Sequence, residues 1–173
     1  MTIVVGVAGT AKNTGKTTTT SALLDEALDR NLNIGLTSIG YDGEEVDNIT
    51  GLPKPRLTLK KGSIVATARK CLLSSTAKFE VIESTDIMTP LGRLYIVEIV
   101  QGGLVVIAGP NKSVELRRIL GMMKKLARCD LIVVDGALNR IAPMVETDGI
   151  ILATGASKNT DIVDLVAETR ALN

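Results

Sequence analysis

The stretch that decides the fold is Ile3-Val4-Val5-Gly6-Val7-Ala8-Gly9-Thr10-Ala11-Lys12-Asn13-Thr14-Gly15-Lys16-Thr17. Its first part is an apolar run with the composition of a buried β-strand, which we expect over about residues 2–8. Its second part is a glycine-rich polar loop, and the segment from Lys16 to about Arg30 has apolar residues at helical spacing. Backbone N–H groups of such a loop, together with the N-terminus of the next helix, form a concave site for anions. The order strand, loop, helix therefore predicts a phosphate-binding site.

The loop contains the residue types that hold a nucleoside triphosphate. Gly15 permits close approach of the backbone to a phosphate, Lys16 reaches the β- and γ-phosphates, and the Thr17 hydroxyl ligates Mg²⁺. We expect ATP and Mg²⁺ as the bound groups, since no Asn-Lys-x-Asp guanine signature occurs. The alternative is a Gly/Thr-rich turn that only caps a buried helix. The residues expected to contact the nucleotide are Thr10, Ala11, Lys12, Asn13, Thr14, Gly15, Lys16, Thr17 and Thr18.

The spacing of the loop also carries a family resemblance. Five residues separate Gly9 from Gly15, where the common P-loop has four, and Thr10 stands at the expected glycine position. The form Gly-Thr-x-x-x-x-Gly-Lys-Thr resembles the loop of dethiobiotin synthetase and its relatives in the MinD-like branch of P-loop NTPases. The MinD subgroup carries a signature lysine at the position of Ala11, and here Lys12 follows one residue later.

A second apolar run, Asp130-Leu131-Ile132-Val133-Val134-Asp135-Gly136, is typical of a buried strand that ends in a carboxylate. Such a strand holds its Asp beside the Thr of a phosphate-binding loop, where it ligates Mg²⁺ directly or through water. The alternative is an Asp that ends a buried strand and caps a turn. The segment from Asp135 to Arg140, followed by Pro143, resembles the Glu-Gly-Ala-Gly-Gly segment of dethiobiotin synthetase.

The resemblance implies a second metal carboxylate beyond the second strand, in the acidic segment 40–47. Asp42 and Asp47 are the candidates, and Asp42 is preferred because it lies closer to the strand end; a solvated acidic loop is the alternative. The expected catalytic residues are Lys16, Asp42 and Asp135, and the expected metal ligands are Thr17, Asp42 and Asp135. Asn139 and Arg140 follow at the same sheet edge. Arg140 either stabilises a transferring phosphoryl group or forms a surface salt bridge.

The pattern as a whole predicts one α/β domain over residues 1–173: a mostly parallel sheet of the P-loop NTPase type, with helices on both faces and an antiparallel hairpin at its edge. Further strands are expected at 34–39, 79–83, 93–100, 104–108, 130–136 and 149–155, with the turn 101–103 joining two of them into a hairpin. Further helices are expected at 63–73 with Ser63 as cap, at 113–127 with Ser113 as cap, and at 160–172, after an irregular basic stretch at 51–62.

Composition narrows the function classes. A net charge of +1 and an aromatic content of 2% with no Trp disfavour a nucleic-acid partner or an acidic membrane surface. The absence of His removes the commonest general base and zinc ligand. No apolar run approaches the roughly 20 residues that span a bilayer. Without a signal peptide, Cys71 and Cys129 are expected to be reduced thiols in the cytoplasm.

A narrower resemblance covers most of the chain. It rests on the loop 9–17 together with Thr37-Ser38-Ile39-Gly40-Tyr41-Asp42-Gly43-Glu44, Val134-Asp135-Gly136-Ala137-Leu138-Asn139-Arg140 and Ile151-Leu152-Ala153-Thr154-Gly155-Ala156. These segments resemble a bacterial family that accompanies cobalamin-dependent amino-acid aminomutases in anaerobes, as proposed reactivating ATPases. On that resemblance the chain is expected to be the nucleotide-binding portion of a longer protein.

Three functions follow from these patterns. The first is an ATPase that drives a conformational change in a protein partner or acts as a homodimer. The second is a carboxylate-activating ligase or kinase like dethiobiotin synthetase, and the third is a non-catalytic nucleotide-binding module. The synthetase family uses a lysine at the end of its second strand, where this chain has Ser38-Ile39-Gly40-Tyr41. That difference favours the first function.

Overall fold

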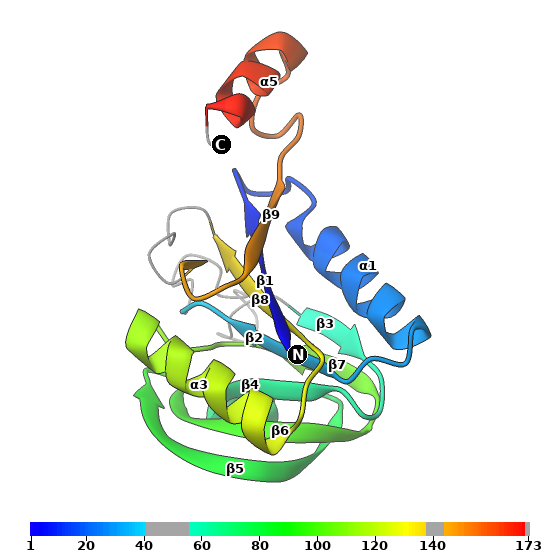
Figure 1. Ribbon diagram of the computed structural model, residues 1–173, viewed down its shortest axis with the longest axis vertical. Helices are drawn as coiled ribbons and strands as arrows, with labels where there is room; N and C mark the ends of the chain where they lie inside the picture. The colour runs from blue at the N-terminus through cyan, green and yellow to red at the C-terminus, as the bar shows by residue number, and fades with distance from the viewer. Residues whose placement is uncertain (41–55, 138–143, 172–173) are drawn as a thin grey trace.

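A computed structural model describes residues 1–40, 56–137 and 144–171 as an α/β fold (Figure 1). Its strands are β1 (Ile3–Gly9), β2 (Ile34–Ser38), β3 (Arg56–Leu59), β4 (Ile64–Ala68), β5 (Lys78–Thr89), β6 (Gly92–Gln101), β7 (Gly103–Val106), β8 (Leu131–Ala137) and β9 (Gly149–Ala153). Its helices are α1 (Lys16–Asp29), α2 (Arg69–Leu73), α3 (Ser113–Leu126) and α5 (Ile162–Arg170).

The main sheet has seven strands in the order β5-β6-β4-β2-β8-β1-β9. The strands from β4 to β9 in that order are parallel, whereas β6 pairs antiparallel with β4 and β5 pairs antiparallel with β6. The predictions of an α/β fold with a mostly parallel sheet and an antiparallel addition at its edge are therefore confirmed.

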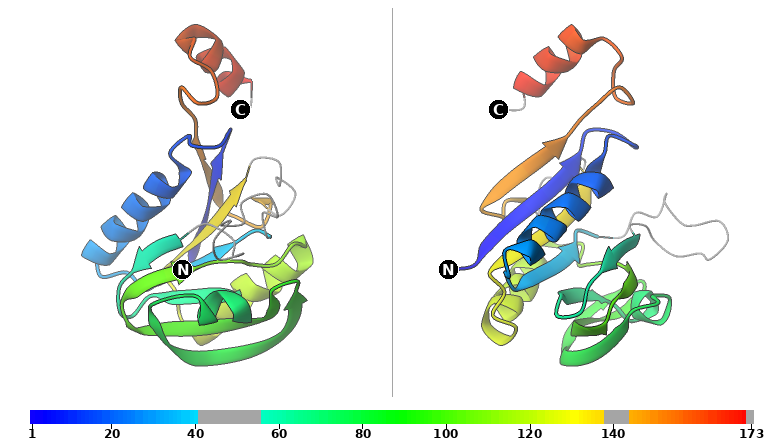
Figure 2. Two further views of the ribbon diagram at one scale, coloured as in Figure 1. Left: turned by 180° about the vertical axis from the view of Figure 1, so that it is seen from behind. Right: turned by 90° about the vertical axis from the view of Figure 1, so that its right-hand side faces the viewer.

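Two hydrophobic clusters hold helices to the central strands. Leu24 and Ala27 of α1 share a cluster with Val133, and Leu116 and Met123 of α3 share the other with the neighbouring residue Ile132. Because successive strand residues point to opposite faces of a sheet, α1 and α3 cover opposite faces. The views in Figure 2 show α1 lying along β1 and β8.

The predicted hairpin over 93–108 is wrong in its pairing. β6 and β7 both form, but β7 leaves the main sheet and pairs antiparallel with β3, where Leu57 lies opposite Val105. The hairpin at the edge of the main sheet is β5–β6, which turns between Thr89 and Gly92. The sequence pattern indicates only a five-residue part of the twelve-residue β5, so it does not reveal that β5 is the partner of β6.

The predicted helix over 63–73 is also wrong in its first half. Residues Ile64–Ala68 form β4, every residue of which is buried between β2 and β6, and only Arg69–Leu73 are helical. The apolar spacing fitted a helix, but pairing on both sides overrides local preference. Ser63 is buried rather than a helix cap. The expected irregular stretch at 51–62 is likewise corrected within its bounds, because Arg56–Leu59 form β3.

The later helices agree with expectation more closely. α3 begins at Ser113, with Lys112 rather than Ser113 at the N-cap, and carries Glu115 in its first turn. α5 is capped by the side chain of Asp161, which accepts hydrogen bonds from two backbone N–H groups of the first turn. None of its residues is buried, and it stands at the far end of the molecule from β5 (Figures 1 and 2). Over the described ranges, no helix is both long and apolar enough to cross a membrane.

Candidate functional site

The predicted phosphate-binding segment folds as a strand, a tight loop and a helix. β1 ends at Gly9 and α1 begins at Lys16, with Gly15 at the N-cap in the left-handed conformation at a φ of 93°. Asn13 is also left-handed, at a φ of 59°. A Cβ on Gly9 would lie 2.9 Å from the Thr14 hydroxyl oxygen. Both glycines are therefore needed, the first for space and the second for its backbone angle.

Threonine side chains brace this loop. The Thr14 hydroxyl donates to the Ala11 carbonyl at 2.9 Å, and the Thr19 hydroxyl donates to the Gly15 carbonyl at 3.1 Å. Thr10 connects the loop to the end of β9: its N–H donates to the Ala153 carbonyl at 3.0 Å, and its hydroxyl donates to that of Thr154 at 2.9 Å. The loop thus has a fixed form that its own polar groups maintain.

All nine residues expected to contact a nucleotide lie in this one segment. Thr14 is buried, and three residues are half-buried: Thr10, Ala11 and Lys16. The other five are exposed: Lys12, Asn13, Gly15, Thr17 and Thr18. The exposed members lie around the N-terminus of α1, which has no acidic residue in its first turn. An anion would meet the positive end of the helix dipole there.

The predicted strand that carries Asp135 runs to the same loop. β8 lies between β1 and β2, and Asp135 aligns with Val7 on one side and with Ser38 on the other. The Nζ atom of Lys16 lies 3.2 Å from Oδ2 of Asp135. The Asp135 side chain is 2% exposed and that of Lys16 is 22% exposed. Two residues 119 positions apart, chosen from separate patterns, are thereby brought into contact.

The oxygen atoms of Asp135 and Thr17 are of the kind that binds Mg²⁺. Mg²⁺ takes oxygen ligands and is often bound by one or two carboxylates together with substrate phosphates and water. Asp135 offers a carboxylate, and Thr17, next to Lys16, offers a hydroxyl. Among the residues that the structure describes, no three His, Cys, Asp or Glu side chains gather as a metal site.

Several predicted residues lie outside the described ranges. Asp42 and Asp47, the candidates for the second carboxylate, fall in 41–55, and Asn139 and Arg140 fall in 138–143. Their roles stay predictions.

The structure adds residues that the sequence patterns did not single out. Thr154 bonds the loop through Thr10, and the Ser38 hydroxyl accepts a hydrogen bond from the Gly109 N–H at 2.9 Å beside the Asp135 strand. The Gly40 N–H donates to the Pro110 carbonyl at 2.8 Å, so segment 109–110 covers the end of β2. The position of Thr154 at the end of an expected strand is a weak sequence signal for its contact with Thr10. The contact between Gly109 and Ser38 joins segments far apart in the sequence, and no sequence pattern indicates it.

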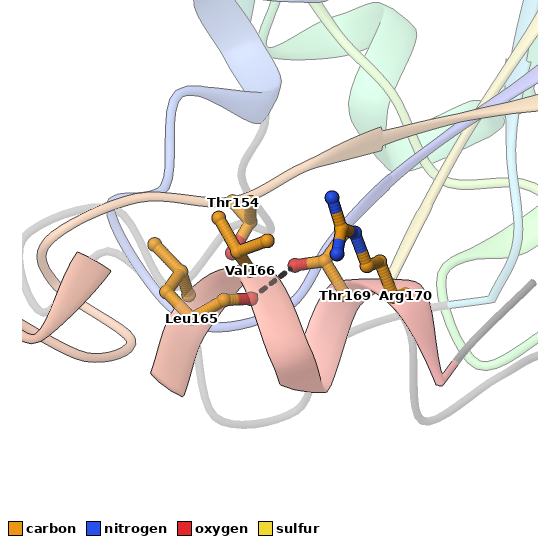
Figure 3. Close-up of a pocket in the computed structure, with 5 residues that line it drawn as sticks. All are labelled: Thr154, Leu165, Val166, Thr169 and Arg170. Atoms are coloured by element: carbon orange, nitrogen blue, oxygen red, sulfur yellow. Dashed lines mark hydrogen bonds between the residues drawn. The ribbon is translucent and has the colours of Figure 1, made fainter. Parts of the chain in front are cut away.

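A pocket of about 240 Å³ adjoins the loop on the side of α5 (Figure 3). Its lining residues are Thr154, Leu165, Val166, Thr169 and Arg170. The Thr169 hydroxyl donates to the Leu165 carbonyl of its own helix at 2.7 Å. The exposed lining is apolar, so this pocket differs in character from the polar loop beside it.

No known protein-family model, curated protein or solved structure matches this chain. The family resemblances therefore stay predictions, and function has to be argued from the residues of the site.

Proposed function

We propose that this chain is a Mg²⁺-dependent ATP-binding protein and ATPase, of the P-loop class that includes MinD and dethiobiotin synthetase. The observation that carries the proposal is the meeting of Lys16 and Asp135, 3.2 Å apart, at the end of a strand-loop-helix unit whose N-cap is a left-handed glycine. A purely structural glycine turn needs neither an ammonium group nor a buried carboxylate at this point.

Each group has a role in phosphate chemistry under this proposal. Backbone N–H groups of residues 11–15 and the N-terminus of α1 receive the β- and γ-phosphates, and Lys16 neutralises their charge. Thr17 and Asp135 hold Mg²⁺, which when bound would offset the charge that develops on the transferred phosphoryl group. Catalysis then consists of positioning and electrostatic stabilisation. Asp42 remains the proposed second carboxylate.

The end of β2 favours an ATPase over a carboxylate-activating ligase. Dethiobiotin synthetases, the ligases that this chain resembles, use a lysine at the end of the second strand. This chain has the buried Ser38 at that position, and the Ser38 hydroxyl accepts a hydrogen bond from the Gly109 N–H. We therefore propose that hydrolysis is coupled to a protein partner, such as a cobalamin-dependent aminomutase, or to a second copy of the chain. The two buried free thiols, Cys71 and Cys129, support a reducing compartment such as the cytoplasm.

Calorimetric titration with Mg·ATP tests the nucleotide site. We expect the wild type to bind and Lys16→Ala to lose measurable binding, because the ammonium group meets the most highly charged part of the ligand. Lys124→Ala is the matched control, since it removes an exposed lysine from the last turn of α3. Equal binding by wild type and Lys16→Ala would defeat the proposal.

Phosphate release then separates the three functions. Basal hydrolysis that rises only with a protein partner supports the coupled ATPase. Strict dependence on a small carboxylic acid indicates a ligase instead. Tight Mg·ATP binding without any hydrolysis indicates a binding module.

A further inference from the structure

The outward face of α3, which Figure 1 shows at the surface of the molecule, gathers positive charge around a bare glycine. Residues three and four positions apart are neighbours on the surface of a helix. At these four positions around Gly121 the chain has only cations, all of them exposed: Arg117, Arg118, Lys124 and Lys125. A Cβ on Gly121 would meet nothing within 4 Å, so the helix backbone is open to approach there. We call these five residues the basic ring.

The two arginines of the basic ring already bind carboxylates from other segments. Nε and Nη2 of Arg117 donate to the two carboxylate oxygens of Glu146 at 2.8 and 2.7 Å. Nη2 of Arg118 donates to Oδ1 of Asp86, in β5, at 2.6 Å. Over the described ranges, neither lysine of the ring has an ion-pair partner. Half of the ring therefore has its counter-charge within the chain and half does not.

The stability of α3 does not account for this face. A glycine in the interior of a helix is destabilising relative to alanine, and no close packing requires Gly121. Arg128 follows the helix at a φ of 49°, a left-handed angle at which glycine or asparagine is usual. The helix dipole favours cations in the last turn, but it explains neither the glycine nor the arginines one turn before it. Residues that local stability would not select are expected where a surface has another role.

We propose that the basic ring is a docking surface for an acidic segment of a partner protein. Carboxylates of that segment pair with Lys124 and Lys125, and its backbone lies against Gly121. Charge complementarity selects this occupant, because residues 116–129 contain no Asp or Glu.

Two other anionic partners fit the face less well. A continuous row of phosphates in a nucleic acid would meet repulsion from Asp86 and Glu146, which already lie at the arginines. The chain also has an aromatic content of only 2% for stacking on bases. An anionic membrane surface binds through apolar side chains as well as cations, and the basic ring has no apolar member.

Fluorescence anisotropy of a labelled octaglutamate peptide, titrated with the full chain at physiological salt, tests the docking surface. We expect Lys124→Glu/Lys125→Glu to bind the peptide at least about tenfold more weakly than the wild type. Lys70→Glu/Lys78→Glu is the matched control, since it makes the same change in net charge at exposed lysines of α2 and β5. It should stay within about twofold of the wild type, because salt screens distant charges. Equal losses in the two variants would overturn the proposal, as would a wild type that does not bind the peptide.

A substitution of the glycine separates docking from folding. Gly121→Glu places a carboxylate within reach of the ring's own cations, so its urea midpoint should rise while its affinity for the peptide falls at least about tenfold. Gly121→Gln has nearly the same shape without the charge and should bind the peptide more tightly than Gly121→Glu. A loss of binding in a more stable protein cannot come from misfolding. Wild-type affinity in Gly121→Glu would overturn the proposal.

The remaining comparisons identify the partner class and separate this inference from the proposed function. An octanucleotide or phosphatidylserine vesicles that bind more tightly than the peptide, and lose binding in Lys124→Glu/Lys125→Glu, would overturn the acidic protein segment as the occupant. The basic ring and Lys16 lie on helices that cover opposite faces of the sheet. Lys16→Ala should therefore bind the peptide as the wild type does, whether or not the chain binds a nucleotide.

Discussion

Gly109 shows how one residue can position the edge of the site. Its N–H donates to the Ser38 hydroxyl at 2.9 Å, and a Cβ added to it would overlap the Ser38 carbonyl oxygen. The backbone of this segment therefore lies directly against the end of β2, one strand away from Asp135. Only glycine permits this approach, for reasons of space rather than backbone angle.

Gly109→Ala should lower the free energy of unfolding by about 1–3 kcal/mol, because backbone must shift to admit the methyl group. Gly121→Ala is the control, since Gly121 is exposed within α3 and a Cβ there meets nothing within 4 Å. Alanine is the better helix former, so this control should gain roughly 0.5–1 kcal/mol. Urea unfolding of the three proteins measures both changes. An alanine at 109 that unfolds at the wild-type midpoint would disprove the steric account.

At the scale of elements, β4 connects the parallel part of the sheet to its antiparallel edge. It pairs with β2 on one side and β6 on the other, and the hydroxyl of its residue Thr67 bonds the chain that follows β7. That hydroxyl accepts from the Ala108 N–H at 2.9 Å and lies 3.2 Å from the Val106 carbonyl oxygen, to which it donates. This buried side chain, together with the Ala68 N–H that donates to the Ala108 carbonyl at 3.1 Å, ties the segment 106–108 to the main sheet.

Thr67→Val should destabilise the fold by about 1–3 kcal/mol, since it keeps the side-chain shape but leaves the buried Ala108 N–H without its acceptor. Thr58→Val in β3 makes the same chemical change at an exposed position and should stay within about 0.5 kcal/mol of the wild type. Thermal and urea unfolding give the comparison. Equal effects of the two substitutions would show that the Thr67 bonds contribute nothing specific.

For the whole molecule, the cluster that packs α3 against the sheet contains both cysteines. Cys71 and Cys129 are free and buried. Burial raises the pKa of each thiol from an ordinary value of 9.0 to about 11, because the thiolate would be poorly solvated there. The neutral thiol is therefore the form that the folded state accommodates.

Stability should fall as the pH rises from about 9 to about 11. In that window the unfolded chain loses thiol protons that the folded chain keeps, so the unfolded state gains stability, by about 1–3 kcal/mol for each thiol. Urea unfolding between pH 8 and about pH 11 measures the slope. The double variant Cys71→Ala/Cys129→Ala, although less stable throughout, should show a shallower decline. Parallel slopes for the two proteins would rule the thiols out as its cause.

Much of the site was predictable because its signals are local. Gly15 and Lys16 are consecutive residues of a glycine-rich loop, and Asp135 ends an apolar run that predicts a buried strand. Parallel strands end at a common edge, so their meeting followed from the order of elements. The 3.2 Å contact between Lys16 and Asp135 brings these two segments together, whereas the metal role of Asp135 stays a prediction.

The sequence by itself determined the strand-loop-helix unit, the buried strand of Asp135 and the α/β class, since each depends on residue types at short spacing. Only the tertiary structure decided that Ile64–Ala68 is a strand, that β7 pairs with β3, and that β5 and β6 form the edge hairpin. Apolar spacing in a short segment fits a helix and a buried strand alike. What distinguishes them is the hydrogen bonding and burial supplied by distant strands, which no local pattern contains.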